Sequence, residues 1–143
     1  MTEQLKRTVR EFYERGWIRG DLSVIDDLFS PDYHDHDADA QTGMSGLEAA
    51  RQFIRSFRAA TPDLHVEIDV QYAEGSTVTT RWNMSGTHEG SLMGVPATHR
   101  PYKISGISID RFDEHGRFVE GWGNWDGIAL LQQIGALPGP EAL

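Results

Sequence analysis

The feature that most constrains the fold is a change of hydrophobic period at Pro62. Before this residue, apolar side chains recur every three or four positions, which is the spacing of amphipathic helices. After it, apolar and polar residues alternate from Leu64 to Tyr72, the spacing of a strand with one buried face. A proline disfavours helical backbone in the residue before it, so Thr61 is a natural helix end. Helices followed by strands are typical of the α+β class.

Several helices are predicted before this boundary. Thr2 is a candidate N-cap of the first helix, and Ser45 and Glu48 have the spacing of a capping box at the start of the third. The polar residues 30–44 are predicted to form a loop. The expected helices run from Thr2 to Gly16, from Asp21 to Ser30-Pro31 and from Ser45 to Thr61.

The second part of the chain predicts an antiparallel sheet of at least four strands joined by turns. We place a β-bulge at Gly106, because the apolar positions change phase between Ile104 and Ile107. Bulges and glycines within strands let a sheet curve strongly, and helices on its concave side would leave a pocket. Strands are expected near residues 64–72, 77–88, 102–112 and 117–126, followed by a short helix that Gly135 and Pro138 close.

Composition narrows the function classes. The 143 residues suit one domain spanning 1–143, and 22 acidic against 13 basic residues give a net charge of -9, the wrong sign for binding nucleic acid. The absence of cysteine excludes disulfides and thiolate chemistry. No apolar run approaches the ~20 residues of a membrane span, and the first residues do not resemble a secretory signal. We therefore expect a cytoplasmic protein without a nucleic-acid or membrane partner.

Asp126 is the first candidate catalytic residue. Alternation along the last strand places Asp126 on the same side as Trp122. A carboxylate beside indole rings in an apolar pocket loses hydration, which raises its pKa and suits it to act as a general base. Alternatively, Asp126 is only the N-cap of the helix that begins at Gly127, because aspartate is a favoured cap.

His88 is the second candidate, because it shares a strand face with Trp82 and Met84 and is expected to point inward. A neutral imidazole there could donate a hydrogen bond to a substrate carbonyl. The alternative is a core histidine whose ring is satisfied by a backbone carbonyl. Large rings such as Trp82 favour a flat hydrophobic ligand.

His34 and His36 lie in an acidic run that could hold a metal if it were extended. No HExxH or comparable helix spacing accompanies them, so a solvated acidic loop at the pocket mouth, with one histidine facing inward, is the preferred interpretation. No nucleophile elbow or phosphate-binding glycine loop is present in the sequence. We therefore expect neither a metal nor a cofactor.

Short motifs in a fixed order carry a resemblance over nearly the whole chain. They are Pro31-Asp32-Tyr33, His36-Asp37, Thr61-Pro62-Asp63, Gly86-Thr87-His88-Glu89-Gly90, Arg111-Phe112, Val119-Glu120-Gly121-Trp122, Trp125-Asp126 and Leu130-Leu131-Gln132-Gln133-Ile134-Gly135. In this order they resemble the SnoaL-like polyketide cyclases of the nuclear transport factor 2-like, ketosteroid-isomerase-like superfamily.

The resemblance implies a cone-shaped α+β fold and a cofactor-free enzyme that closes a ring in an aromatic polyketide ester by intramolecular aldol condensation. It carries the acid/base role to Asp126 and implies that His88 and His36 line the cavity, with Trp122 and Asn124 near the base. One departure is Ala97-Thr98-His99-Arg100, where the family commonly has Pro-Thr-Gly-Arg. This places the extra imidazole of His99 near the cavity rim and leaves the substrate open.

Other functions remain compatible with the same resemblance. Related folds include hydroxylases, dehydratases and epoxide hydrolases, and a fold alone does not fix a reaction. A noncatalytic module that binds a hydrophobic small molecule is a further alternative. The resemblance also implies a homo-oligomer that pairs through the exposed sheet.

Overall fold

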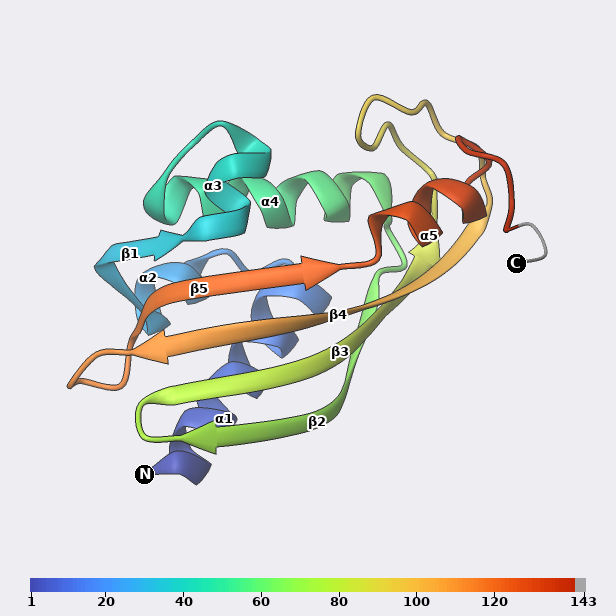
Figure 1. Ribbon diagram of the computed structural model, residues 1–143. Coiled ribbons are helices and arrows are strands. Elements are labelled where there is room, and N and C mark those ends of the chain that lie inside the picture. The colour runs from blue at the N-terminus through green and yellow to red at the C-terminus, as the bar shows by residue number, and fades with distance from the viewer. Residues whose placement is uncertain (141–143) are drawn as a thin grey trace.

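The computed structural model describes residues 1–140, in which a curved five-stranded sheet is covered by helices on one face (Figure 1). The strand order is β1-β5-β4-β3-β2. Neighbours from β2 to β5 are antiparallel, as predicted, whereas β1 runs parallel to β5. The predicted α+β class is confirmed. The strands are β1 (Phe29–Asp35), β2 (His65–Glu74), β3 (Thr77–Thr87), β4 (Pro101–Phe112) and β5 (Phe118–Trp125).

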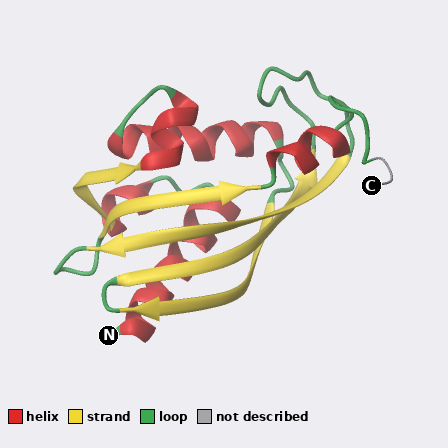
Figure 2. Ribbon diagram, viewed as in Figure 1, coloured by secondary structure: helices red, strands yellow, loops and turns green. Residues whose placement is uncertain are grey.

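The helices form a layer against the sheet, and the last one packs near the start of β4 (Figure 2). None of the helices within residues 1–140 is long and apolar enough to cross a membrane. The helices are α1 (Thr2–Phe12), η1 (Tyr13–Ile18, a π-helix), α2 (Ser23–Leu28), α3 (His36–Thr42), α4 (Gly46–Ala60) and α5 (Gly127–Gln133).

The N-terminal helical segment continues beyond Gly16, so the predicted end at this residue is wrong. Gly16 lies inside η1 and is buried, and a Cβ there would meet Phe12 at 3.2 Å and Val24 at 3.3 Å. Its small size therefore lets α2 pack closely. The predicted N-cap is also displaced by one residue, because Met1 occupies the cap position and Thr2 is the first helical residue.

Residues 30–44 do not form the predicted loop, because they contain β1 and α3. The parallel pairing of β1 with β5 supplies hydrogen bonds that local sequence patterns cannot indicate. Asp35 then caps α3, since its Oδ1 accepts hydrogen bonds from the backbone N–H groups of Asp37 and Ala38. The chain therefore has two elements, β1 and α3, that the sequence patterns did not predict.

β4 keeps one phase along its whole length, so the β-bulge predicted at Gly106 is wrong. Gly106 pairs regularly with Trp82 and Trp125, and a Cβ there would lie 2.3 Å from the indole of Trp82. The glycine leaves room for that ring. The irregularity lies instead between Arg111 and Phe112, opposite β5. As a result the inner face of β4 carries Tyr102, Ile104, Gly106, Ser108, Asp110 and Phe112.

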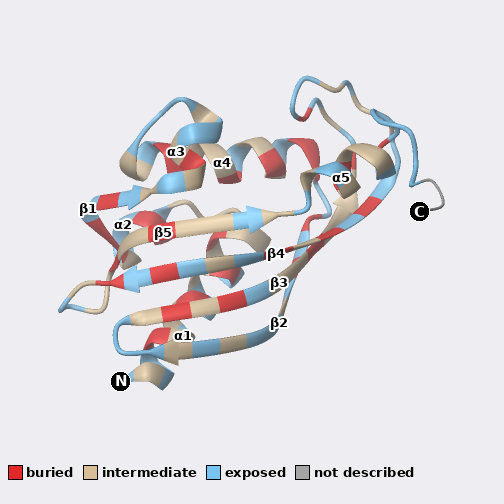
Figure 3. Cartoon of the chain, viewed as in Figure 1, coloured by how far each residue is buried: buried red, intermediate tan, exposed pale blue. Residues whose placement is uncertain are grey.

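Buried residues occur on both the helices and the strands, where the two layers face each other (Figure 3). Phe29 of β1 stacks on Phe118 of β5 with ring centroids 4.4 Å apart, and Phe12 meets both rings edge-on. Val9 and Ile54, which are fully or almost fully buried, complete this packing from α1 and α4. The core is therefore dense where β1 meets β5.

Candidate functional site

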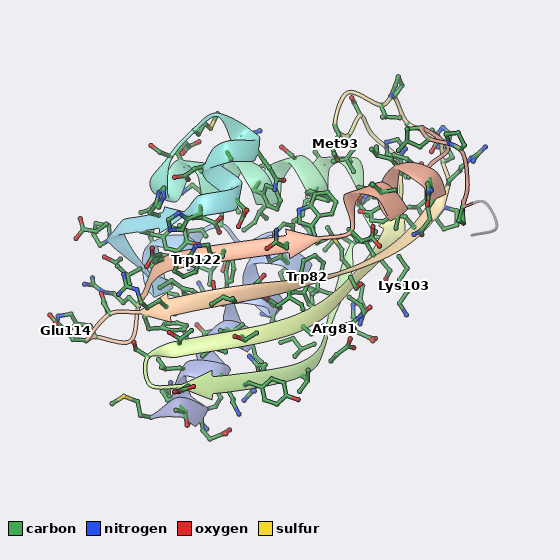
Figure 4. The ribbon with its side chains drawn as sticks, viewed as in Figure 1. Arg81, Trp82, Met93, Lys103, Glu114 and Trp122 are labelled. Carbon is green, nitrogen blue, oxygen red and sulfur yellow. The ribbon has the colours of Figure 1, made fainter. Side chains whose placement is uncertain are left out.

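A cavity of about 110 Å³ lies between the helical layer and the inner face of the sheet. Aromatic side chains dominate its wall, and two of them, Trp82 and Trp122, come from β3 and β5 (Figure 4). Trp17 and Phe57 approach edge-on with centroids 6.1 Å apart, and Phe57 meets Trp125 in the same way at 5.6 Å. Such a wall suits a flat hydrophobic ligand.

Among the polar side chains that interrupt this apolar lining, five come from β4, β1 and η1. Alternation along β4 turns Ser108 and Asp110 inward, β1 contributes Tyr33 and Asp35, and η1 begins with Tyr13. These elements are separated from one another in the sequence. The polar cluster consequently exists only in the folded chain.

Asp110 is the most unusual member of the cluster. It is only 8% exposed, and no side-chain hydrogen bond or ion pair within residues 1–140 involves its carboxyl group. Burial raises the pKa of Asp110 to about 8, and the negative charge of the nearby Asp35 adds to this effect. Asp110 therefore carries a proton at neutral pH but can lose it at little cost, as an acid/base catalyst requires.

Asp35 faces the same space as Asp110 and is held firmly. Its Oδ2 accepts a hydrogen bond from the Tyr33 hydroxyl at 3.0 Å, and its Oδ1 accepts the two backbone hydrogen bonds that cap α3. Burial, followed by the charge of Asp35, raises the pKa of Tyr33 well above its usual value. Tyr33 thus remains a hydrogen-bond donor.

Gly121 of β5 lies where these groups converge. A Cβ at this position would stand 2.7 Å from Tyr33 Oη, 3.2 Å from Asp35 Oδ2 and 3.3 Å from Asp110 Oδ1. A side chain would therefore displace the phenol and crowd both carboxyl groups. The absent side chain of Gly121 allows them to share one space.

Tyr13 approaches Asp110 from the helical layer. Burial, followed by the charge of Asp110, raises the pKa of Tyr13, while hydrogen bonds from Ser108 and Thr80 partly oppose the shift. Ser108 is itself fixed, because its Oγ accepts a hydrogen bond from Trp82 Nε1 at 3.0 Å. Tyr13 is a neutral phenol that can donate to an oxygen in the cavity.

The position expected for Asp126 is wrong. Asp126 is exposed and does not line the cavity, and its Oδ1 accepts a hydrogen bond from the backbone N–H of Ala129 at 3.0 Å. Because α5 begins directly after β5, the carboxylate turns toward the free N–H groups of that helix. Of the two interpretations of Asp126, the structure supports the helix cap.

The histidines expected in the cavity lie outside it. His88 is fully buried under the 89–100 turn, where its Nδ1 accepts a hydrogen bond from the Thr98 N–H at 3.2 Å, and it is not a lining residue. The burial matches the core-histidine alternative, but its ring is only partly satisfied, because Nε2 has no hydrogen-bond partner among residues 1–140. The side chain of His99 is 70% exposed and contacts Glu89.

His36 lies beside the cavity wall without lining it. Its ring stacks on Trp122 with centroids 4.8 Å apart, and its Nε2 lies 2.7 Å from Glu120 Oε2. His34 contacts Asp39 instead, and residues 1–140 contain no group of three or more acidic or histidine side chains arranged to hold a metal. Of the expected ligand-binding residues, Trp82 and Trp122 line the cavity, while Asn124 is exposed on β5.

Sequence reasoning missed Tyr13, Tyr33, Asp35 and Asp110 as site residues. The sequence did hold one signal for Asp110. If the alternation that begins at Ile104 is continued unchanged to Phe112, Asp110 points inward. The apparent phase change, caused by two exposed isoleucines, concealed it. No local signal indicated Asp35, whose position depends on the pairing of β1 with β5.

The fold and the aromatic cavity define a class of α+β proteins that enclose a small hydrophobic molecule between a curved sheet and its helices. Residues 7–134 match the SnoaL-like polyketide cyclases. The chain belongs to this family, whose members bind small hydrophobic molecules and are typically enzymes. No curated protein matches the sequence.

Solved structures agree with this assignment. TsrD from Streptomyces laurentii is 26% identical, with a TM-score of 0.85, covering 96% of this chain and 99% of that one. AclR from Streptomyces galilaeus, for which hydroxylase activity has been suggested, is 27% identical, with a TM-score of 0.83 and coverage of 96% and 100%. IdmH from Streptomyces antibioticus, suggested to be a polyketide cyclase, is 31% identical, with a TM-score of 0.78 and coverage of 92% and 99%.

Proposed function

We propose that this protein is a cofactor-independent cyclase that closes a ring by intramolecular aldol condensation, with Asp110 as the acid/base. The observation that carries the proposal is the buried carboxyl group of Asp110 in an aromatic cavity, which has no side-chain partner within residues 1–140. This residue takes the role that the family resemblance implied for Asp126, which lies outside the cavity. The proposed substrate is a flat, hydrophobic molecule with two carbonyl groups.

The reaction begins when ionised Asp110 removes a proton from a carbon next to a carbonyl group. The electron pair of that C–H bond forms an enolate, and the Tyr13 hydroxyl donates a hydrogen bond to the enolate oxygen. The enolate carbon then attacks the second carbonyl, which forms the new C–C bond and leaves an alkoxide. The alkoxide takes the proton back from Asp110, so the substrate and the ring-closed product are isomers.

The cavity contributes by exclusion and orientation as much as by proton transfer. A positioned acid/base typically supplies about 100-fold to 10,000-fold of rate. Holding the two carbonyl groups in contact supplies a further large factor, because the chain no longer samples unreactive conformations. The aromatic wall fits this role, since it can hold a flat substrate in place by contact with its rings.

Hydrolytic opening of an epoxide is a second candidate, favoured by the two carboxyl groups that meet at Gly121. Protonated Asp110 would give its proton to the epoxide oxygen as the C–O bond breaks. Asp35 would take a proton from the attacking water, whose oxygen forms the new C–O bond. Assays with a panel of epoxides separate the two candidate reactions, because only epoxide hydrolysis consumes water.

The direct test compares Asp110→Asn with Asp126→Asn on a panel of polyketide esters. Asp110→Asn should lower kcat at least 100-fold while ligand binding persists, whereas Asp126→Asn should stay within about threefold of wild type. The opposite ranking would return the acid/base role to Asp126. Ligand binding without turnover of either the esters or the epoxides would instead indicate a noncatalytic binding module.

A further inference from the structure

The cavity has acidic groups without basic ones. Among the described residues, its lining includes the carboxyl groups of Asp35, Asp37 and Asp110, but no arginine, lysine or histidine. Elsewhere carboxylates are commonly paired, as with Asp27 and Arg15 at 2.7 Å. Among residues 1–140, no ion pair involves any of the three cavity carboxyl groups.

Two of these carboxyl groups have structural hydrogen bonds, but the third does not. Asp35 accepts from Tyr33 and caps α3, and Asp37 Oδ2 accepts from the Gly123 N–H at 2.6 Å. Asp110 has no such partner among the described residues, although it is nine-tenths buried and lines the cavity. The ionised form of Asp110 therefore has no counter-charge among the described residues, and a cationic ligand could supply one.

The remaining wall suits the same kind of ligand. Trp17, Trp82 and Trp125 line the cavity, and indole rings can attract cations through their negative faces. Trp82 is anchored by its hydrogen bond to Ser108, which lies two residues from Asp110 on the same strand face. Aromatic rings and an acidic side chain in one cavity can form a site for an organic cation.

We propose that the cavity binds an aromatic ligand that carries a positively charged nitrogen, with Asp110 as its counter-ion. The inference rests on the proposed function, because it names the substrate class of the same site. A cation beside Asp110 favours its carboxylate form, so binding releases the proton from Asp110. The ligand would thereby produce the base that proton abstraction from carbon requires.

The groups that face Asp110 make the direction of the pH dependence clear. Tyr13 from η1 and Tyr33 from β1 stay neutral, because their pKa values are raised. The carboxylates of Asp35 and Asp37 add to the attraction for a cation. Affinity for a permanently charged cation should therefore rise with pH as Asp110 ionises, and affinity for an anion should fall.

The test is a binding titration that needs no turnover. Benzyltrimethylammonium, benzyl alcohol and benzoate share one ring and differ in charge, and tryptophan fluorescence can report their binding. At pH 8.5 the cation should bind at least tenfold more tightly than benzoate, with the alcohol between them. Between pH 8.5 and pH 6 the affinity for the cation should fall several-fold. Equal binding of the three probes, or tightest binding of benzoate, would overturn the inference.

Variants separate local from general charge effects. Asp110→Asn should remove most of the pH dependence of cation binding, whereas Asp32→Asn, an exposed β1 carboxylate, should leave it unchanged. Equal effects of the two variants would show that the net charge of the chain causes the preference for a cation, and would overturn the role of Asp110. Cation selectivity in a protein without cyclase activity would refute only the proposed function, and cyclase activity without this selectivity would refute only the present inference.

Discussion

Asp110 and Asp126 are the same chemical group in two contrasting environments. Asp110 lies inside the cavity, 8% exposed and without a side-chain hydrogen bond among the described residues, and burial raises its pKa to about 8. Asp126 stands in solvent at the start of α5, where a backbone N–H of that helix donates to it. The comparison shows that folding buries one aspartate and raises its pKa, while it leaves the other in solvent as a helix cap.

Alanine substitutions at Gly121 and Gly123 should give the largest difference between the cavity and its surroundings. A methyl group at Gly121 would enter the space shared by Tyr33, Asp35 and Asp110, whereas one at Gly123 would meet only Ser108 Oγ, at 3.7 Å. Gly121→Ala should lower kcat/KM about 100-fold and cost about 1–3 kcal/mol of stability. Gly123→Ala should change both far less. Kinetics and urea unfolding of both variants provide the check, and equal effects would contradict the assigned role of Gly121.

The stability of the protein should depend on pH through Asp110. Its folded pKa of about 8 lies above the ordinary 3.8, so the folded state retains a proton that the unfolded chain releases. This contribution is complete below pH 4 and is lost as pH rises to 8, with a limiting slope of about 1.4 kcal/mol per pH unit. Asp110→Asn should remove that slope and raise Tm at pH 8.

Thermal unfolding from pH 4 to pH 9 measures this effect. Asp126→Asn serves as the control and should keep the wild-type slope, because Asp126 is exposed. A slope that persists in Asp110→Asn would show that another group carries the proton.

The smallest expected effect belongs to the exposed member of the pair. Asp126→Ala removes the acceptor for the Ala129 N–H and should lower the free energy of unfolding by about 1 kcal/mol. Turnover should change less than threefold, because the residue does not line the cavity. Denaturant unfolding and steady-state kinetics test the two expectations separately, and a large loss of turnover at unchanged stability would contradict our assignment.

Much of the fold could be predicted because its signals are local. Proline at position 62 and the alternation after it marked the change from helices to strands, and the antiparallel strands β2 to β5 followed in order. β1 escaped prediction because its partner, β5, lies more than eighty residues later in the chain. α3 escaped with it, since its cap, Asp35, is the last residue of β1.

The site was harder to predict, because its residues come together only through packing. Trp82 was expected in a cavity wall and lies there, since it shares an inward strand face with buried Met84. Ile107 and Ile109 are misleading signals, because both are exposed on the outer face while polar Ser108 and Asp110 point inward. Hydrophobicity alone therefore assigns the wrong face of β4 to the interior beyond Gly106. Such an error is expected beside a functional cavity, which needs polar groups on an otherwise apolar inner face.

The central claim is that the carboxyl group inside the cavity holds a proton at neutral pH. Carbon-13 NMR of protein labelled at aspartate side-chain carboxyls, with Asp110→Asn used to assign the resonance, measures this directly. We predict a titration midpoint for Asp110 near pH 8. A midpoint near pH 4 would mean that Asp110 is an ordinary solvated carboxylate and would contradict the account.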